Sequence, residues 1–327
     1  MKKVELHLHL DGSVRESTIA ELLNKKLEDI KDKLHVNDYN SSLTEYLTKF
    51  DMPIKVMQTK ENLKRIAREL GEDLKKDDVI YAEVRFAPQL HTKEGLSYDD
   101  VVLSVIEGFK KCNIKINIIL CMMRGASYID NLKTIEVAEK YLNKGVVALD
   151  LAGDEKHFKT KDYKELFKVA KEKEIPFTIH AGEADDANSV LDAISFGAKR
   201  IGHGIRIIDD ENAIGEVIKN KVTLEVCPTS NFQTKVVDLY KNHPIKKLYE
   251  KGVLITISTD NNTVSNITLS KEYEYLRSYF NFTNEDFLTF NINAINAAFI
   301  SEKEKKKYIK MLIDNYSKII LNKKNML

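Results

Sequence analysis

Eight short apolar segments, each followed by turn residues and a helical pattern, constrain the fold of this 327-residue chain most strongly. They are rich in β-branched and aliphatic residues and cover residues 4–10, 79–86, 114–123, 146–153, 176–183, 199–204, 222–228 and 253–260. Amphipathic stretches between them, such as 62–76, 162–174 and 212–220, predict helices. Strands that alternate with helices pair in parallel through right-handed crossovers. The pattern therefore predicts an α/β fold, a (β/α)8 TIM barrel, with a doubly wound open sheet as the alternative.

The interval between the first two predicted strands, residues 12–78, is much longer than the others and has room for several helices, including one at 43–50. Loops that follow barrel strands lie at the face where barrel active sites are built. We therefore expect one domain over residues 1–327, with extra helices inserted after strand 1 that form a lid over about 12–78; a peripheral decoration is the alternative. A last helix is expected at 307–324, with an apolar stripe that packs on the barrel: Ile309, Leu312, Ile313, Tyr316, Ile319 and Ile320.

The charge balance and the cysteines narrow the classes of partner. The 51 lysine and arginine residues nearly match the 50 aspartate and glutamate residues, so no basic footprint predicts nucleic acid or an anionic membrane as a partner. Three cysteines without a CxxC pair argue against a disulfide framework and favour the cytoplasm. Glu5, His7 and His9 interrupt any apolar core of a signal peptide. The nearly apolar run 116–123 is far shorter than the roughly 20 residues that span a bilayer.

Histidines and one aspartate stand at the ends of several predicted strands. Side chains at positions i and i+2 of a strand share a face, so His7 and His9 point the same way, opposite aliphatic neighbours. His180, His203 and Asp260 end three further strands. Three imidazoles and one carboxylate make an ordinary divalent-metal site, with zinc favoured. Two hydrogen-bonded interior histidines are the alternative explanation of the first pair. The other four histidines are expected to be surface or packing residues without partners: His35, His91, His157 and His243.

Further residues near these strand ends could take part in chemistry. Glu183 follows His180 by three residues and could act as a general acid, or simply complement a helix dipole. His203 could serve as a base or as an orienting group. Gly153 could offer its N–H to a ligand, although a plain tight turn explains it equally well. With a metal that has an open position, these groups indicate hydrolysis at an electrophilic carbon, of an amide, a phosphoester or an amidine-like C–NH2.

Arg85 and Glu83 in the second predicted strand are charged residues within an apolar run. We expect them to form ion pairs in the interior and assign them no catalytic role. Asp260 is followed by two asparagines, which is also ordinary turn chemistry.

Four ordered motifs resemble those of the adenosine deaminase family of metal-dependent hydrolases: HLHLDGS (7–13), TIHAGE (178–183), RIGHGIR (200–206) and STDN (258–261). The match is extended by EVRFAP (83–88), ALDLAGDE (148–155), EVCPTSN (225–231) and FNINAINAAF (290–299). The resemblance therefore covers nearly the whole chain. It differs from the cytidine-deaminase type, which uses HxE and PCxxC motifs that are absent from this sequence.

The resemblance implies a role for each matching residue. One zinc ion per chain would be bound by His7, His9, His180 and Asp260. Glu183 would protonate purine N1, and His203 would orient and deprotonate the attacking water, with Asp260 also reaching that oxygen. Substrate contacts would come from Asp11 to the ribose 5′-hydroxyl, from the Gly153 N–H to N3, from Asn261 and His9, and from Leu47 and Phe50 in an apolar lid.

The implied reaction converts adenosine and 2′-deoxyadenosine to inosine and 2′-deoxyinosine plus ammonia, in purine salvage. Asn261 stands where many family members have an aspartate facing N7, and its amide can still donate to N7. Asp11 favours a nucleoside, since the adenine-specific branch usually has glutamate there. The alternatives are a deaminase of another 6-aminopurine compound (aminodeoxyfutalosine or adenine), a catalytically inactive nucleoside-binding relative, and a structural barrel without metal. Nothing in the sequence indicates an oligomeric state.

Overall fold

The computed structural model describes residues 1–36 and 43–324. Its strands are β1 (Lys3–His9), β2 (Val79–Phe86), β3 (Lys115–Met123), β4 (Val146–Ala152), β5 (Thr178–Ala181), β6 (Arg200–His203), β7 (Thr223–Val226) and β8 (Leu254–Ile257). Each of the eight predicted segments coincides with one of these strands; β1 begins one residue before its segment, and the other seven strands lie within theirs. All neighbouring strands pair in parallel, as the alternation with helices predicts.

Two four-stranded sheets, in the orders β1-β2-β3-β4 and β5-β6-β7-β8, make up the barrel. Backbone hydrogen bonds join them at both seams. At one seam His9 N–H donates to Asp260 O (2.7 Å), and at the other Leu149 N–H donates to Pro176 O (2.9 Å). The strands therefore curve around one axis, and the predicted (β/α)8 barrel is confirmed.

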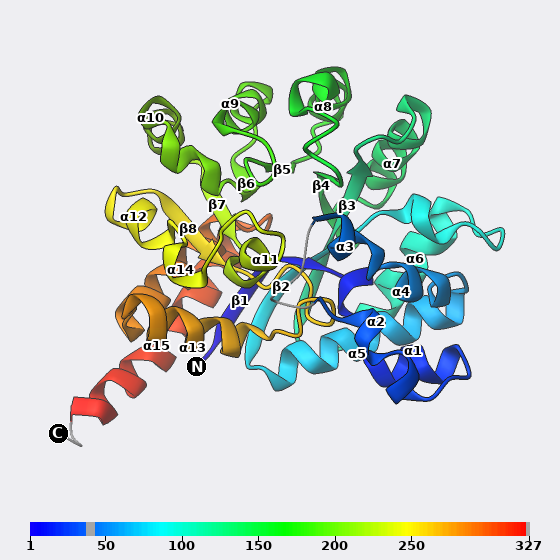
Figure 1. Ribbon diagram of the computed structural model, residues 1–327, viewed down its shortest axis with the longest axis horizontal. Helices are drawn as coiled ribbons and strands as arrows, with labels where there is room; N and C mark the ends of the chain where they lie inside the picture. The colour runs from blue at the N-terminus through cyan, green and yellow to red at the C-terminus, as the bar shows by residue number, and fades with distance from the viewer. Residues whose placement is uncertain (37–42, 325–327) are drawn as a thin grey trace.

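Helices surround the strands on the outside (Figure 1). They are α5 (Lys60–Lys76), α6 (Tyr98–Phe109), α7 (Tyr128–Tyr141), α8 (Lys164–Glu172), α9 (Ala187–Phe196), α10 (Glu211–Lys219), α12 (Ile245–Glu250), α13 (Leu269–Phe280) and α14 (Asn284–Ala297). Their boundaries follow local chemistry. Helix α5, for example, begins after Thr59, whose side chain accepts a hydrogen bond from Asn62 N–H, and it buries Leu63, Ile66 and Leu70 along one face.

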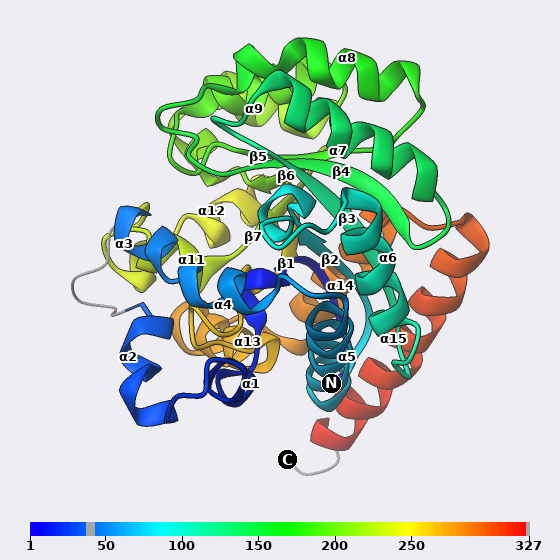
Figure 2. The same cartoon turned by 90° about the vertical axis from the view of Figure 1, so that its right-hand side faces the viewer.

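Short helices fill the long interval after β1: α1 (Glu16–Leu22), α2 (Lys31–Leu34), α3 (Leu43–Thr48) and α4 (Asp51–Val56). The predicted interval 12–78 also contains α5, which packs against β2 and α6 as an ordinary outer helix of the barrel. Both views place α3 on the same side of the barrel as α11 (Pro228–Gln233), which follows β7 (Figures 1 and 2). A lid function for these helices stays a prediction.

The last helix, α15 (Glu302–Lys324), packs against α14. Leu312 and Tyr316 of its predicted apolar stripe are fully buried. Ile313 is 44% exposed, so its inclusion in the stripe is wrong. It directly follows Leu312, and the 100° turn per residue carries it off the packed face. Among the described helices, none combines the length and the apolar composition that a bilayer crossing requires.

Candidate metal centre and active site

The carboxyl end of β1 carries the first pair of candidate ligands. Val4, Leu6 and Leu8 of this strand are buried in the apolar core, whereas His7 and His9 point to the barrel interior. The His7 side chain is fully buried and that of His9 is 12% exposed. The two-faced pattern predicted from the alternation is therefore present.

Four candidate ligand groups converge here: atoms of His7, His9, His180 and Asp260 all lie within 4.8 Å of one another. His9 Nε2 is 3.2 Å from His180 Nε2, and Asp260 Oδ1 is 3.4 Å from His9 Nε2. The buried His7 Nε2 has no hydrogen-bond partner among the described residues. Because an unpaired buried nitrogen is costly and a cation would pair all four groups, this donor set fits a divalent metal ion.

Two of the candidate ligands, His7 and His180, each contact a buried carboxylate through the second ring nitrogen. His7 Nδ1 lies 2.9 Å from Glu225 Oε2, and His180 Nδ1 lies 2.8 Å from Asp150 Oδ2. Metal-binding histidines typically direct their second ring nitrogen at such an acceptor, which fixes the ring and its tautomer. Burial, assisted by the positive charge of Arg85, lowers the pKa of His7 to about 4, so its ring is neutral at pH 7, the form that binds metal.

Two buried arginines hold these carboxylates in place. Arg85 donates to Asp150 Oδ2 and to Glu225 Oε2, both at 2.7 Å, and Arg200 donates to Glu225 Oε1 at 2.6 Å and also pairs with Glu83. The interior ion pairs predicted for Arg85 and Glu83 are confirmed, but each residue pairs with a residue of another strand. The sequence analysis missed Asp150 and Glu225, although a charged residue within an apolar strand is a usable signal.

Asp260 follows β8 with a left-handed backbone, φ +64°. Its N–H donates to His7 O (2.9 Å), so the hydrogen bonds that close the barrel also fix this residue. Its Oδ2 accepts a hydrogen bond from Ser230 Oγ (2.6 Å) and lies 3.5 Å from the Tyr46 hydroxyl. Burial alone would raise the pKa of Asp260, but the ring of His7, whose Nε2 lies 3.5 Å from Asp260 Oδ1, and the other nearby imidazoles hold it well below its ordinary value. The carboxyl is therefore ionised.

The turn that carries Glu183 is held by the buried side chain of Glu155, which sequence reasoning also missed. Its carboxylate accepts hydrogen bonds from the N–H groups of Gly182, Glu183, Ala184 and Asp185, at 2.6 to 3.1 Å, and from Ser189 Oγ at 2.5 Å. Burial raises the pKa of Glu183. Glu183 Oε2 lies 3.5 Å from His203 Nε2, so the structure brings together the two residues for which acid–base roles are predicted.

Asp11 and Asn261, two of the predicted substrate contacts, are both buried. Asp11 begins a short turn after β1, and its Oδ1 has no partner among the described residues. Burial raises its pKa to about 7. Asn261 Nδ2 donates to the Tyr46 hydroxyl at 2.7 Å. Next to it, a Cβ added to Gly12 would stand 1.7 Å from Asn261 Oδ1, so this close approach requires glycine.

Gly153 lies in the turn after β4 with φ +103°, a conformation that favours glycine, so the predicted tight turn is present. Of the two predicted lid residues, Leu47 is 41% exposed, and the half-buried Phe50 packs on the cluster formed by Val36, Tyr46 and Val264. Tyr46, beside Leu47 in α3, is the buried one. It escaped the sequence analysis because its hydroxyl partners lie more than 200 residues away.

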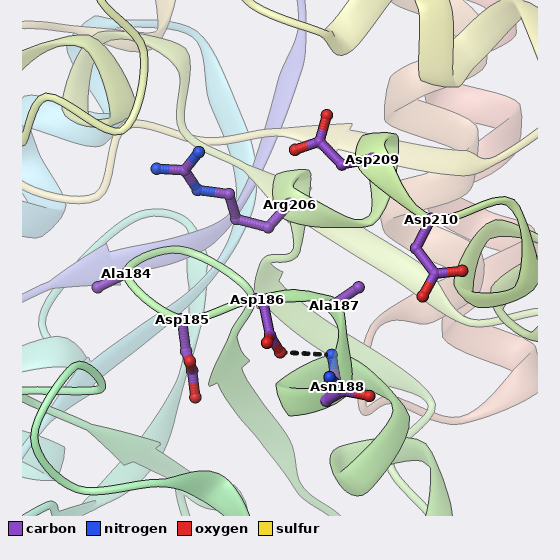
Figure 3. Close-up of a pocket in the computed structure, with 8 residues that line it drawn as sticks. All are labelled: Ala184, Asp185, Asp186, Ala187, Asn188, Arg206, Asp209 and Asp210. Atoms are coloured by element: carbon purple, nitrogen blue, oxygen red, sulfur yellow. Dashed lines mark hydrogen bonds between the residues drawn. The ribbon is translucent and has the colours of Figure 1, made fainter.

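A cavity of about 330 Å³ opens beside Glu183 and is also lined by Leu47, Asp154 and Thr234. Arg206 and Ala184 line both this cavity and a neighbouring pocket of about 460 Å³ (Figure 3). The second pocket carries four aspartates, Asp185, Asp186, Asp209 and Asp210. Asp186 and Asp210 cap the N-termini of α9 and α10, which accounts for two of them. None of the metal-ligand candidates lines either cavity, but Glu183 lines the smaller one and is absent from the larger, so the smaller cavity is the one that reaches a candidate catalytic residue.

The four remaining histidines are not all without partners, as was expected. His35 Nδ1 contacts Thr263 O at 2.7 Å, and the exposed His157 contacts Asp154 at 2.7 Å. His243 is buried and bonded to Asn231, and the buried ring of His91 packs on the ring of Phe86 with the centroids 5.9 Å apart. The expectation of no partners is therefore wrong for three of them, because residues distant in sequence meet them in the fold.

Comparison with known proteins agrees with this geometry. A family model described as "Adenosine deaminase" matches residues 2–315. The chain is 45% identical over 328 residues to an adenosine deaminase of Clostridium botulinum (strain 657 / Type Ba4), an alignment that covers 96% of this chain and 98% of the relative. An adenosine deaminase of Clostridium perfringens (strain SM101 / Type A) is 43% identical over 94% of this chain and 96% of its own length. Among solved structures, the adenine deaminase of Arthrobacter aurescens has the same fold, with a TM-score of 0.85, 22% identity and coverage of 97% of this chain and 98% of that one.

Proposed function

Since this chain belongs to the adenosine deaminase family, we propose that it catalyses the hydrolytic deamination of adenosine and 2′-deoxyadenosine to inosine and 2′-deoxyinosine plus ammonia, in purine salvage. The observation that carries this proposal is the convergence of metal-binding groups with an acid and an imidazole at one end of the barrel: His7, His9, His180, Asp260, Glu183 and His203. Relatives without catalysis would have no need to keep this set complete.

In this proposal one zinc ion per chain is held by His7, His9, His180 and Asp260, a set of three imidazoles and one carboxylate that suits zinc. Bound there, the ion would supply a Lewis acid that makes hydroxide available near neutral pH. Asp150 and Glu225 keep the His180 and His7 rings turned toward the ion through their Nδ1 atoms. Arg85 forms ion pairs with both carboxylates, so neither Asp150 nor Glu225 is a buried charge without a partner.

Glu183 acts on the purine ring. Because burial raises the pKa of its carboxyl, Glu183 keeps its proton to higher pH than an exposed glutamate and can give it to N1. Protonation at N1 draws electrons from C6 and makes that carbon more electrophilic. His203, 3.5 Å from Glu183, orients the water that attacks C6, and the ionised Asp260 accepts one proton of that water. This proton passes to the amino group, which leaves as ammonia, and the proton of the new C6 hydroxyl returns to Glu183 as the carbonyl forms.

The remaining residues orient the nucleoside. Gly153 N–H faces N3, and Asp11 with His9 receives the ribose 5′-hydroxyl. Asn261 uses one N–H for Tyr46, and the second N–H of the same amide serves N7. A 5′-phosphate would meet the buried carboxyl group of Asp11 and would be repelled once Asp11 ionises, so the site favours a nucleoside over a nucleotide.

The deciding experiment measures adenosine consumption and ammonia release by purified, zinc-loaded protein, side by side with 2′-deoxyadenosine, adenine and aminodeoxyfutalosine. We expect the highest kcat/KM for the two adenine nucleosides. Adenosine left unchanged while another 6-aminopurine compound is consumed would replace this function by the second candidate. Failure to convert any of them, with zinc bound, would identify a nucleoside-binding relative. We expect a cytoplasmic enzyme whose partner is the small-molecule substrate, without nucleic acid or membrane.

A further inference from the structure

A chain of three hydrogen bonds runs from a backbone amide to the ring of His203. Ile245 N–H donates to His243 Nδ1 (3.1 Å), His243 Nε2 lies 3.2 Å from Asn231 Oδ1, and Asn231 Nδ2 lies 3.1 Å from His203 Nδ1. The three side chains are buried: 3% of His243, 0% of Asn231 and 1% of His203 is exposed. Neither His243 nor Asn231 is among the residues to which a metal or substrate contact is assigned.

The first donor gives this chain a direction. A backbone N–H can only donate, so His243 Nδ1 must accept and the proton of the neutral ring must be on Nε2. Burial lowers the pKa of His243 to about 3, in keeping with a neutral ring. That proton needs an acceptor, which fixes the Asn231 side chain with its oxygen toward His243 and its NH2 group toward His203. His203 Nδ1 then has to accept.

We propose that Asn231 and His243 are positioning residues that fix the neutral tautomer of His203, with its proton on Nε2 and its lone pair on Nδ1. His203 Nε2 is the atom that faces Glu183 and the site. Resting on the proposed function, this means that His203 donates a hydrogen bond to the attacking water oxygen and orients it. A base at this position would need a free lone pair on Nε2, and the chain of donors disfavours that tautomer.

The backbone supports the same arrangement. Asn231 belongs to α11, where its N–H donates to Cys227 O (3.0 Å) and its O accepts from Val237 N–H (3.1 Å). These two hydrogen bonds fix the backbone position from which its side chain extends. His203 has a left-handed backbone, φ +62°, and its ring nitrogen Nδ1 lies 3.1 Å from Asn231 Nδ2. Burying three polar side chains is costly unless each is paired, and every ring nitrogen of His243 is paired here.

The test reads the tautomer directly, by 15N NMR of zinc-loaded protein labelled at its histidine rings, with the His203 signals assigned from their loss in His203→Asn. In the wild type we expect an unprotonated Nδ1 and a protonated Nε2. The isosteric Asn231→Asp places an acceptor against Nδ1, so the His203 proton should appear on Nδ1. A wild-type His203 protonated on Nδ1, or an unchanged His203 spectrum in Asn231→Asp, overturns the proposal.

A pair of variants at position 243 separates positioning from packing. His243→Phe fills the space but frees the Asn231 amide to rotate; losing one such hydrogen bond should lower kcat roughly tenfold, with KM within about twofold. His243→Gln can still donate to Asn231 and should restore most of kcat. Equal kcat values in the two variants would contradict the proposal. The NMR readout needs no turnover, so a protein that fails to deaminate adenosine but has the expected tautomer contradicts the proposed function alone.

Discussion

Two parts of the candidate site differ in how their buried polar groups are supported by the rest of the protein. The metal floor comprises His7, His9, His180 and Asp260 with the supporting carboxylates Asp150 and Glu225. The substrate roof comprises Asp11, Asn261, Tyr46, Leu47 and Phe50. In the floor, His7 and His180 contact the carboxylates of Glu225 and Asp150, and Arg85 donates hydrogen bonds to both carboxylates. In the roof, Asp11 Oδ1 and Asn261 Oδ1 lack a hydrogen-bond partner among the described residues, and Leu47 is 41% exposed.

Under the proposed function, this difference separates the groups that bind the metal from the groups that recognise the substrate. Ligand groups must be held close to their productive geometry, which requires rings locked by hydrogen bonds and packing. Groups that recognise a substrate need open donors and acceptors until the substrate arrives. Unpaired buried oxygens are costly, and the substrate removes that cost when it binds. Under the proposed function, and among the residues that the structure describes, the floor leaves His7 Nε2 unpaired for the ion, whereas the roof leaves Asp11 Oδ1 and Asn261 Oδ1 unpaired for the substrate.

The largest expected effect comes from Glu183→Gln, which removes the proton for N1 but leaves the metal floor intact. We expect kcat to fall by roughly a thousandfold, the range seen for loss of a general acid, with an unchanged zinc content. Single-turnover kinetics together with elemental analysis check this. Loss of zinc in this variant would show that metal binding depends on Glu183, and the metal floor would then not be independent of the groups that act on the substrate.

The next largest effect is expected from the carboxylate that contacts the candidate ligand His180. Asp150→Asn weakens the acceptor behind His180 Nδ1 and should lower zinc affinity by about 10- to 100-fold, measured by competition with a chelator. Glu83→Gln is the matched control, because Glu83 belongs to the same buried ion-pair network but contacts Arg200 instead of a ligand. Both variants should be less stable than the wild type. Equal zinc affinity in the two would show that Asp150 serves the core alone.

A smaller effect is expected in the roof. Tyr46→Phe removes the hydroxyl that contacts Asn261 and Ser265, and loss of about one hydrogen bond should raise KM for adenosine roughly fivefold. Zinc affinity should be unchanged. Tyr279→Phe, at a 52% exposed position, provides the control. A reduced zinc affinity in Tyr46→Phe would mean that the roof also supports Asp260, which the Tyr46 hydroxyl approaches at 3.5 Å.

The smallest effect is expected for Leu47→Ala. Leu47 lines the cavity beside Glu183 but is partly exposed, so a substrate would bury only part of its side chain. We expect KM to rise by about two- to threefold, with kcat unchanged, since only a fraction of the usual burial energy is gained. Steady-state kinetics with Phe50→Ala alongside checks this. A larger effect for Leu47 than for Phe50 would indicate that the roof moves inward over the substrate.

The site residues that could be predicted from the sequence are those whose position follows from the pattern of a single strand. Alternation within residues 4–10 indicates which face carries His7 and His9, and each of the eight strands overlaps a predicted segment because the signals of strands are local. His180 and Asp260 could be predicted because barrel strands all end at one face. Their chemical roles stay predictions until the variants are measured.

The part that sequence reasoning missed depends on the register between distant strands. Glu225 meets His7 across 218 positions, and Tyr46 meets Asn261 across 215. Asn231 and His243 become a pair only once α11 and the turn before α12 are placed. No periodicity within one element encodes such contacts, so a charged residue in an apolar strand was the available signal, and it identified Arg85 and Glu83 without their partners.

The seam between β8 and β1 has a consequence for synthesis of the chain. His7 and His9 are made first, but Asp260 arrives about 250 residues later and joins them through the backbone bonds of the closing seam. A ribosome that adds ~5–20 residues per second leaves the amino-terminal strand with an open edge for many seconds. If these groups bind the metal as proposed, a nascent chain that lacks its last strand has an incomplete set of ligands, and metal uptake would report that the barrel has closed.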